Sequence, residues 1–393
     1  MDFTILAFCH PYCLEGKCNM HLSEIWHSKK NDSRLSRTQV NKYMKLLEST
    51  WSDAVSNDPK HRPQVMDWPS TTVRKEWCRR PQEAHVVDGK KIRRMSVAEI
   101  AAIQGFPENW VMVEGTTESE RIAVLGNAVP PALSIVLSHL LQDNIVFQNN
   151  TLIEICAGIG GLSSGFDYLQ PIAKIELWDV AAKILRTDKP WPAECVVEGY
   201  AQDFNYSEYR GRVGLLCGGP PCQPWSMSGH KKGAEDPRDV MGFTPVAIAE
   251  CEPEVFLFEN VPGLLLNKEH QAYVADLFDR MSKPKEGLKY GLAVKIVNAA
   301  DYGVPQVRRR VIMLGIKGKS NAYANKILKK IDKLATHHDP SKPAIDKSPW
   351  VTLRQAFEGI PVTEPWHQWK ATEETLKRLE IDYSDEDFDD YNS

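Results

Sequence analysis

Residues 151–166 read TLIEICAGIGGLSSGF, an apolar run that passes directly into a glycine-rich turn. The run predicts a strand, and the glycines let the backbone approach a ligand and aim the N–H groups of a following helix at it. Glu176 lies 18 residues beyond Gly158, about where an acidic residue binds a nucleotide ribose. Ser163 stands where GxGxxG has its third glycine, so we expect a nucleoside site other than a nicotinamide site. A tight strand–helix turn without a ligand is the alternative.

Three more apolar runs bounded by Gly, Pro or Asn follow: VGLLCGG (213–219), VFLFENV (255–261) and VIMLGI (311–316). Such runs are typical of central strands in a parallel sheet that is covered on both faces. Segments such as GFDYLQ (165–170) and FTPVAIAECEP (243–253) can supply crossover helices. We therefore predict an α/β fold with a mostly parallel sheet. Upstream, Ser96 and Glu99 form a capping-box pattern for a helix that ends at Gly105, and proline starts a second helix, PALSIVLSHLL (131–141).

The composition bounds the class of protein. The chain has 393 residues, of which 42% are hydrophobic and 25% charged, as in a soluble globular protein of two or three domains. No apolar run reaches the roughly 18 residues that a membrane helix needs. The N-terminus lacks the basic and small-residue features of a signal peptide. Nine scattered cysteines do not form a disulfide framework, so we expect a reducing cytoplasm.

The net charge of −4 hides an uneven distribution. Seven acidic residues and no basic one follow from Glu380 onward, and we expect this tail to be disordered. Residues 1–95 hold 17 Lys and Arg against 11 Asp and Glu. That excess is compatible with phosphate contact, although a mildly basic surface often serves only solubility.

Three stretches carry candidate catalytic residues. Cys222 lies in the loop GGPPCQPWSMSG (218–229), where a thiolate at a loop-to-helix junction suits a nucleophile. Glu259 and Asn260 end the apolar run 255–261, and a part-buried carboxyl there can hold or donate a proton. Period-2 alternation in VPQVRRRVIML (304–314) places Arg308 and Arg310 on one face. Taken singly, these residues have structural explanations: Cys222 could be a core residue, and the arginine run could be a solvated face. Their occurrence together in one α/β unit favours a catalytic site.

The motifs GGPPCQPWS, ENV, YGVPQVRRR, ICAGIGG, QGFP and GNAVPP resemble those of DNA (cytosine-5) methyltransferases, over roughly residues 93–318. That family begins with the glycine loop and ends with the GNAVPP helix. Here GNAVPP (126–131) comes before ICAGIGG (155–161), so the chain resembles a circularly permuted member. QDNIVFQNN (142–150) is a linker of suitable length to join the last helix to the first strand. The resemblance implies a Rossmann-like methyltransferase domain with a small irregular target-recognition domain.

The resemblance also implies roles. Cys222 would attack C6 of a flipped-out cytosine, Glu259 would contact N3 with help from Asn260, and Arg308 and Arg310 would hold the base and its flanking phosphate. Flipping the base costs a few kcal/mol, which contacts in the pocket offset. The methyl donor would be S-adenosylmethionine, with Glu176 at the ribose and Asp203 at the adenine amine. The full set expected to line its site is Cys156, Ala157, Gly158, Ile159, Gly160, Gly161, Glu176, Leu177, Asp203, Phe204, Pro221, Met241, Asn127 and Val129.

Three positions depart from the family pattern. Cys156 replaces the usual phenylalanine of the glycine loop, which alters one apolar wall of the donor site. Asp239 stands where glycine is common. Leu177 follows the acidic residue in place of an aromatic one, which weakens stacking on adenine.

We expect residues 1–92 to form the N-terminal part of the recognition region, 93–148 the cofactor-side helices, 149–318 the catalytic core, 319–379 the rest of the recognition side, and 380–393 the tail. The permutation cuts through the recognition interval, so residues 319–393 and 1–92 should come together to face DNA. Recognition would fall mainly on the basic N-terminal part, which contains Trp26, Trp51, Trp68 and Trp77.

The expected partner is duplex DNA, in a modification system paired with a restriction endonuclease, and we expect a cytoplasmic monomer, nucleoid-associated in a bacterium or phage-encoded. Alternatives are a tRNA methyltransferase of the same fold, a non-catalytic DNA-binding relative, and a nicotinamide enzyme. Intact Cys222 and Glu259 motifs disfavour the second, and those residues with Ser163 disfavour the third. The N-terminal cluster of Cys9, His10, Cys13, Cys18, His21 and His27 could offer four ligands to zinc, which is the alternative. We predict no metal, because the cluster lacks a CxxC pair and the family that the chain resembles does not require a metal.

Overall fold

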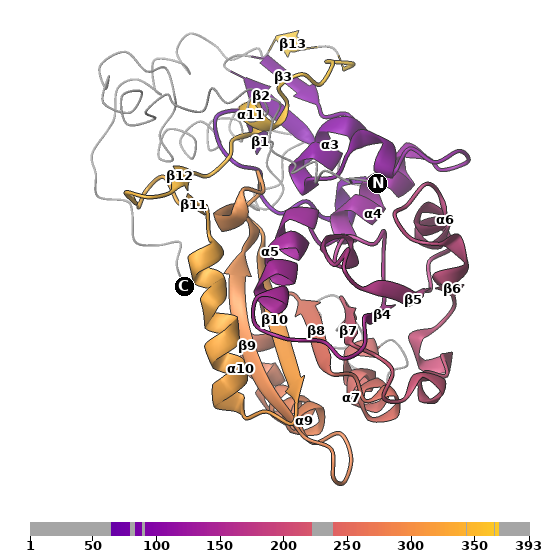
Figure 1. Ribbon diagram of the computed structural model, residues 1–393. Coiled ribbons are helices and arrows are strands. Elements are labelled where there is room, and N and C mark those ends of the chain that lie inside the picture. The colour runs from indigo at the N-terminus through magenta and orange to yellow at the C-terminus, as the bar shows by residue number, and fades with distance from the viewer. Residues whose placement is uncertain are drawn as a thin grey trace.

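A computed structural model describes residues 64–78, 83–88, 91–221, 239–342, 344–364 and 366–368. At its centre lies a seven-stranded sheet in the order β6-β5-β4-β7-β8-β10-β9 (Figure 1). Its strands are β4 (Thr151–Ile155), β5 (Gln170–Glu176), β6 (Val196–Glu198), β7 (Leu215–Gly218), β8 (Val255–Asn260), β9 (Tyr290–Asn298) and β10 (Arg309–Lys317). The strands from β6 to β8 pair in parallel, whereas β10 runs antiparallel to both β8 and β9. The predicted α/β fold with a mostly parallel sheet is confirmed.

Two details of the sequence prediction are wrong. The run 311–316 is a central strand, but it is antiparallel. The segment 165–170 is not a crossover helix: a 3₁₀ turn, η5 (Ser163–Gly165), leads instead toward β5. The reason is spatial, because α5 (Pro131–Gln142) packs against this turn so closely that a Cβ atom on Gly165 would lie 2.6 Å from the Ile135 amide nitrogen.

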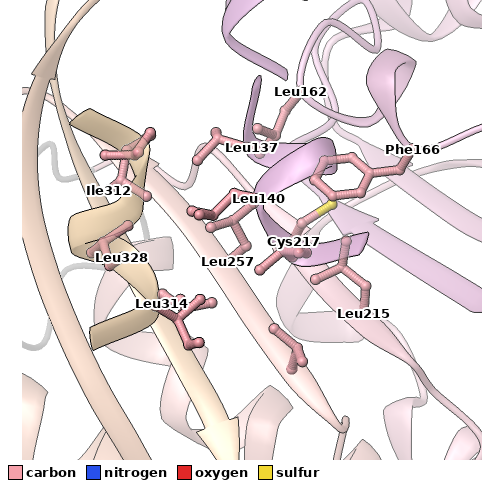
Figure 2. Close-up of a cluster of buried hydrophobic side chains, with 14 of the residues drawn as sticks. Leu137, Leu140, Leu162, Phe166, Leu215, Cys217, Leu257, Ile312, Leu314 and Leu328 are labelled. Carbon is pink, nitrogen blue, oxygen red and sulfur yellow. The ribbon is translucent and has the colours of Figure 1, made fainter. Parts of the chain in front are cut away.

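Side-chain alternation along the central strands fills two cores. On β10, Ile312 and Leu314 point toward the face covered by α5 and α10 (Asn321–Leu328), where Leu137 and Leu328 complete the cluster (Figure 2). Val311 and Met313 point to the opposite face, which is covered by α7 (Val240–Cys251) and α9 (Gln271–Ser282). Because successive side chains of a strand point to opposite faces, a single apolar run contributes residues to both cores. This is the pattern expected of a sheet covered on both faces.

The helices upstream of the sheet follow their sequence signals. Helix α3 (Val97–Gln104) has the predicted capping box of Ser96 and Glu99 and ends at Gly105 in the left-handed conformation. Helix α4 (Glu118–Asn127) precedes α5, which starts with its proline as predicted. The stretch 118–142 is long and apolar enough to cross a membrane by length and composition, but 72% of its most apolar window is buried inside the protein. It therefore contributes a pair of core helices to the described structure.

The N-terminal and C-terminal segments meet in a second, small sheet (top of Figure 1). Arg354 bonds both Asp67 and Asp88, at 2.7 and 2.6 Å, which ties the two ends of the chain together. The described parts of the two segments are thus in contact, and their expected role in facing DNA stays a prediction. The strands of this sheet are β1 (Gln64–Val65), β2 (His85–Asp88), β3 (Lys91–Arg94) and, from the other end of the chain, β13 (His367–Gln368), which pairs antiparallel with β3.

The remaining elements are short. Trp77 lies in η3 (Lys75–Cys78) and is almost fully buried, so it is a core residue and does not form part of a DNA-facing surface. Trp26, Trp51, the Cys/His cluster and the acidic tail lie outside the described residues.

The other short elements are η4 (Glu108–Trp110), α6 (Asp179–Arg186), η6 (Ala193–Cys195), η7 (Ala201–Asp203), η8 (Tyr206–Tyr209), α8 (Gly263–Leu266), η11 (Lys268–His270), η12 (Ala299–Tyr302), η13 (Lys329–Leu334), β11 (His337–His338), β12 (Ser348–Pro349) and α11 (Leu353–Ala356).

Candidate active site

A cavity of about 780 Å³ lies at the carboxyl ends of the parallel strands β5, β7 and β8. This is the edge at which open α/β sheets bind ligands. The cavity is also bordered by the end of α4, by the start of β10 and by η3. Ten of the predicted site residues line it: Asn127, Cys156, Gly158, Glu176, Leu177, Pro221, Glu259, Asn260, Arg308 and Arg310.

The glycine turn forms one wall by its backbone conformation. Cys156 and Gly158 have positive φ angles of 51° and 56°. The Gly158 N–H donates to one Glu176 carboxylate oxygen at 2.7 Å, and the Trp178 N–H donates to the other at 2.8 Å. Burial raises the pKa of Glu176, while these backbone N–H groups act to lower it. The carboxylate is thus fixed at the wall, with lone pairs left to accept from ligand hydroxyls.

The other glycines of the turn serve packing. A Cβ atom on Gly160 would lie 2.4 Å from the Trp191 ring, and one on Gly161 would lie 2.1 Å from the Val129 carbonyl oxygen. Ala157, Ile159, Gly160, Gly161 and Val129 do not border the cavity, so their expected contacts with the donor stay a prediction. Burial also raises the pKa of the Cys156 thiol, which replaces the family's phenylalanine.

Asp203, Phe204 and Met241 do not line the cavity either, although Met241 Sδ lies 3.6 Å from Nδ2 of Asn260, which does. Asp203 is exposed at the end of η7, and Phe204 stacks on Tyr209 at a centroid distance of 5.6 Å. Met241 is fully buried under the sheet. The turn presents Tyr200 and Gln202 to the cavity in place of the predicted pair.

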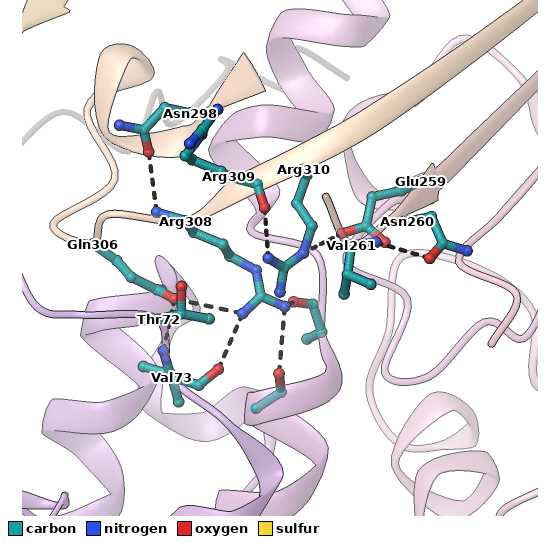
Figure 3. A network of polar contacts seen from close by, with 12 residues as sticks. Thr72, Val73, Glu259, Asn260, Val261, Asn298, Gln306, Arg308, Arg309 and Arg310 are labelled. Carbon is teal, nitrogen blue, oxygen red and sulfur yellow. Dashed lines mark hydrogen bonds and ion pairs between the residues drawn. The ribbon is translucent and has the colours of Figure 1, made fainter. Parts of the chain in front are cut away.

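The opposite wall holds a charged pair that joins two strands. Arg310 Nε lies 2.7 Å from Glu259 Oε1, and both side chains are 10% exposed (Figure 3). Because β8 and β10 are antiparallel neighbours, with Ile312 opposite Glu259, the pair spans their adjacent ends. Burial lowers the pKa of Arg310, and the neighbouring Glu259 opposes that change.

Arg308 is directed differently from Arg310. Its guanidinium donates to the carbonyl oxygens of Val73 (3.1 Å), Gly126 (3.3 Å) and Ala128 (2.9 Å) (Figure 3). Burial lowers its pKa well below the usual arginine range. The expectation that Arg308 holds a base and a phosphate is therefore corrected, because its two terminal nitrogens bind backbone carbonyls. Of the three guanidinium nitrogens of Arg308, Nε alone has no partner in the described part of the chain.

Asn260 anchors the loop that leads to the predicted nucleophile. Its Nδ2 donates to the Pro220 carbonyl oxygen at 3.0 Å, and the Met241 N–H donates to the Pro221 carbonyl oxygen at 3.3 Å. Asp239, the departure from glycine, caps α7 by accepting from the Gly242 N–H at 3.0 Å. Cys222 itself lies outside the described residues. The described residues on either side of the loop are thus fixed at the cavity.

Several cavity residues escaped the sequence analysis, and those with charged, aromatic or amide side chains are Lys75, Glu76, Trp178, Tyr200 and Gln202. Trp178 had a usable signal, since it is an aromatic residue directly after Leu177 and restores an aromatic side chain to this wall. Lys75 and Glu76 had none, because they reach the cavity from a distant part of the chain. Among the residues that the structure describes, no cluster of His, Cys, Asp and Glu is suited to hold a metal.

Comparisons with known proteins are consistent with this geometry. Residues 15–140 and 150–382 match the model of the C-5 cytosine-specific DNA methylase family. The Type II methyltransferase M.NgoMIV of Neisseria gonorrhoeae is 35% identical over 178 residues, covering 44% of this chain and 53% of that protein. M.AplI of Arthrospira platensis is 36% identical over 184 residues, covering 45% of this chain and 49% of that protein. The chain thus spans about half the length of these curated relatives.

Proposed function

This chain belongs to the C-5 cytosine-specific DNA methylase family, and from that premise we propose that it transfers a methyl group from S-adenosylmethionine to C5 of a flipped-out cytosine in a specific duplex DNA sequence. One observation supports this most: a single cavity joins the Gly158–Glu176 wall, suited to a nucleoside, to the Arg310–Glu259 pair, suited to a base. We further propose that the protein is a cytoplasmic monomer and that its DNA methylation is paired with a restriction endonuclease.

The donor side of the cavity has room for the proposed ligand. Gly158 and Gly199 both line it, and a Cβ atom on either would meet nothing within 4 Å, so these backbones border open space. A volume of about 780 Å³ is in the usual range for a ligand of this size. Glu176, Leu177 and Trp178 would hold the adenosine part, and Asn127 lies at the same cavity. The bound donor supplies an electrophilic methyl group.

The base side would carry the reaction on cytosine. The Cys222 thiolate would add to C6, which makes C5 nucleophilic; after methylation, loss of the C5 proton would let the carbon–sulfur bond break and release the thiolate. Glu259 would contact N3, and Arg310 would fix the orientation of the Glu259 carboxyl through their 2.7 Å contact. Asn260 would set the position of the nucleophile loop through Pro220.

We also propose that the chain is a circularly permuted member of its family. Helix α5 precedes β4 in the sequence yet packs on the sheet beside it, and Asn127, upstream, shares the cavity with Gly158, downstream. The family match in two segments, 15–140 and 150–382, supports the proposal. The joined terminal segments would then form the DNA-recognition region.

The test measures transfer of labelled methyl groups from S-adenosylmethionine to mixed duplex DNA and to bulk tRNA, followed by nucleoside analysis. We expect 5-methylcytosine in DNA. Label found only in RNA would show that the substrate is RNA and not DNA. Label found in neither nucleic acid would contradict the proposal. The variant Cys222→Ser should abolish transfer and bind the donor as the wild type does; full activity would exclude Cys222 as the nucleophile.

A further inference from the structure

A pair of opposite charges from the recognition side borders the donor cavity. Lys75 and Glu76 line both the main cavity and an adjoining recess of about 320 Å³, which shares Asn127 and Trp178 with it. Lys75 is exposed and Glu76 half-buried. Within the described part of the chain, neither side chain has an ion pair or a side-chain hydrogen bond. The pair is therefore available to a ligand.

The turn that carries them is held rigidly from two sides. Gly126 of α4 approaches it so closely that a Cβ atom there would lie 2.3 Å from the Lys75 amide nitrogen. On the other side, Gln306 accepts from the Val73 N–H at 2.8 Å, and Arg308 donates to the Val73 carbonyl (Figure 3). The backbone that carries the two charges is thus fixed at the cavity before a ligand binds, which lowers the cost of ordering on binding.

We propose that Lys75 and Glu76 bind the zwitterionic amino-acid end of the methyl donor, the Lys75 ammonium its carboxylate and the Glu76 carboxylate its α-ammonium. This assignment rests on the proposed function. Glu176 and Gly158 would take the nucleoside end, and Glu259 with Arg310 the cytosine. The unpaired Lys75–Glu76 pair then matches the donor's remaining charges, through charge-assisted hydrogen bonds.

The charge pattern favours this ligand over a DNA phosphate. A phosphate contact gains from Lys75 but is opposed by the adjacent Glu76, since like charges repel, whereas a zwitterion uses both residues. A consequence is that donor binding bridges the recognition side and the catalytic core, with Arg308 and Gly126 as the rigid connection.

The test compares two ligands by calorimetry: S-adenosylhomocysteine, which carries the amino-acid end, and 5′-methylthioadenosine, which lacks it. Lys75→Ala and Glu76→Gln should each weaken S-adenosylhomocysteine binding about tenfold and leave methylthioadenosine binding unchanged. Lys91→Ala, an exposed lysine of β3 away from the cavity, is the matched control and should change neither.

The outcomes separate the assignment from the proposed function. If the wild type binds S-adenosylhomocysteine but both variants bind it equally well, the assignment is wrong and the proposed function stands. An equal loss for both ligands would indicate a distorted site and overturn the assignment. A further contrary result is that Lys75→Ala leaves S-adenosylhomocysteine binding unchanged and reduces, by about one, the slope of the logarithm of DNA affinity against the logarithm of salt concentration. That result would overturn the assignment and make Lys75 a phosphate contact. A wild type that binds neither ligand would refute both.

Discussion

The two walls of the cavity are built by different means. At the ends of β4 and β5, main-chain geometry forms the wall: positive φ angles and backbone N–H groups fix Glu176. At the ends of β8 and β10, charged side chains form it, through the Arg310–Glu259 pair. Substitutions of Glu259 or Arg310 on the second wall should therefore change the reaction while the fold persists. Substitutions around the first should change stability or donor binding.

The largest expected effect is on the side-chain wall. Glu259→Gln removes the carboxylate that would contact N3 and leaves Arg310 without its charged partner. We expect methyl transfer to fall by about 10³-fold, as for loss of a group that stabilises developing charge or moves a proton. Donor affinity, measured by calorimetry, should stay within about twofold. Glu198→Gln, on an exposed glutamate of β6, is the control. Near-normal transfer in Glu259→Gln would show that this wall is not catalytic.

Arg308 and Arg310 test whether two nearby arginines at the start of β10 have different roles. Arg308→Met leaves the buried carbonyls of Val73, Gly126 and Ala128 without their donor, so the free energy of unfolding should drop by about 3 kcal/mol. Arg310→Met should cost less stability, because its main contact is the Glu259 side chain at the cavity, but more activity. Chemical denaturation and methyl transfer measure the two effects. Equal stability losses would contradict the division of roles.

The glycine turn offers a comparison inside one wall. Gly161→Ala places a Cβ atom 2.1 Å from the Val129 carbonyl oxygen, a backbone contact that cannot rotate away. We expect a loss of about 2 kcal/mol in the free energy of unfolding. Gly158→Ala meets no neighbouring atom, although its φ of 56° disfavours alanine, and it should instead weaken donor binding by projecting into the cavity. Thermal unfolding and calorimetry distinguish the two, and the reverse pattern would refute our division of the turn.

Sequence predicted the sheet well where apolar runs and turns are local, as at 151–157 and 255–261. It failed where the deciding partner is distant. Alternation placed Arg308 and Arg310 on one side, but the carbonyls that Arg308 binds lie up to 235 residues away in the chain. Spacing likewise could not tell that the turn after β6 presents Tyr200, and not Asp203, to the cavity.

The smallest expected effect concerns the pH dependence of stability through Glu176. Burial raises the pKa of this carboxyl in the folded state, so the native protein holds the proton more tightly than the unfolded chain. Ionisation then costs stability, and the free energy of unfolding should fall as the pH rises from about the ordinary value of 4.5 through the raised one. Glu176→Gln cannot ionise and should lack this decline, so its stability relative to the wild type should increase with pH over that window. Parallel urea titrations of both proteins across the window measure the difference. A difference that is constant with pH would show that the backbone N–H groups of Gly158 and Trp178 fully offset the burial, and the main-chain wall would then hold its carboxylate without cost.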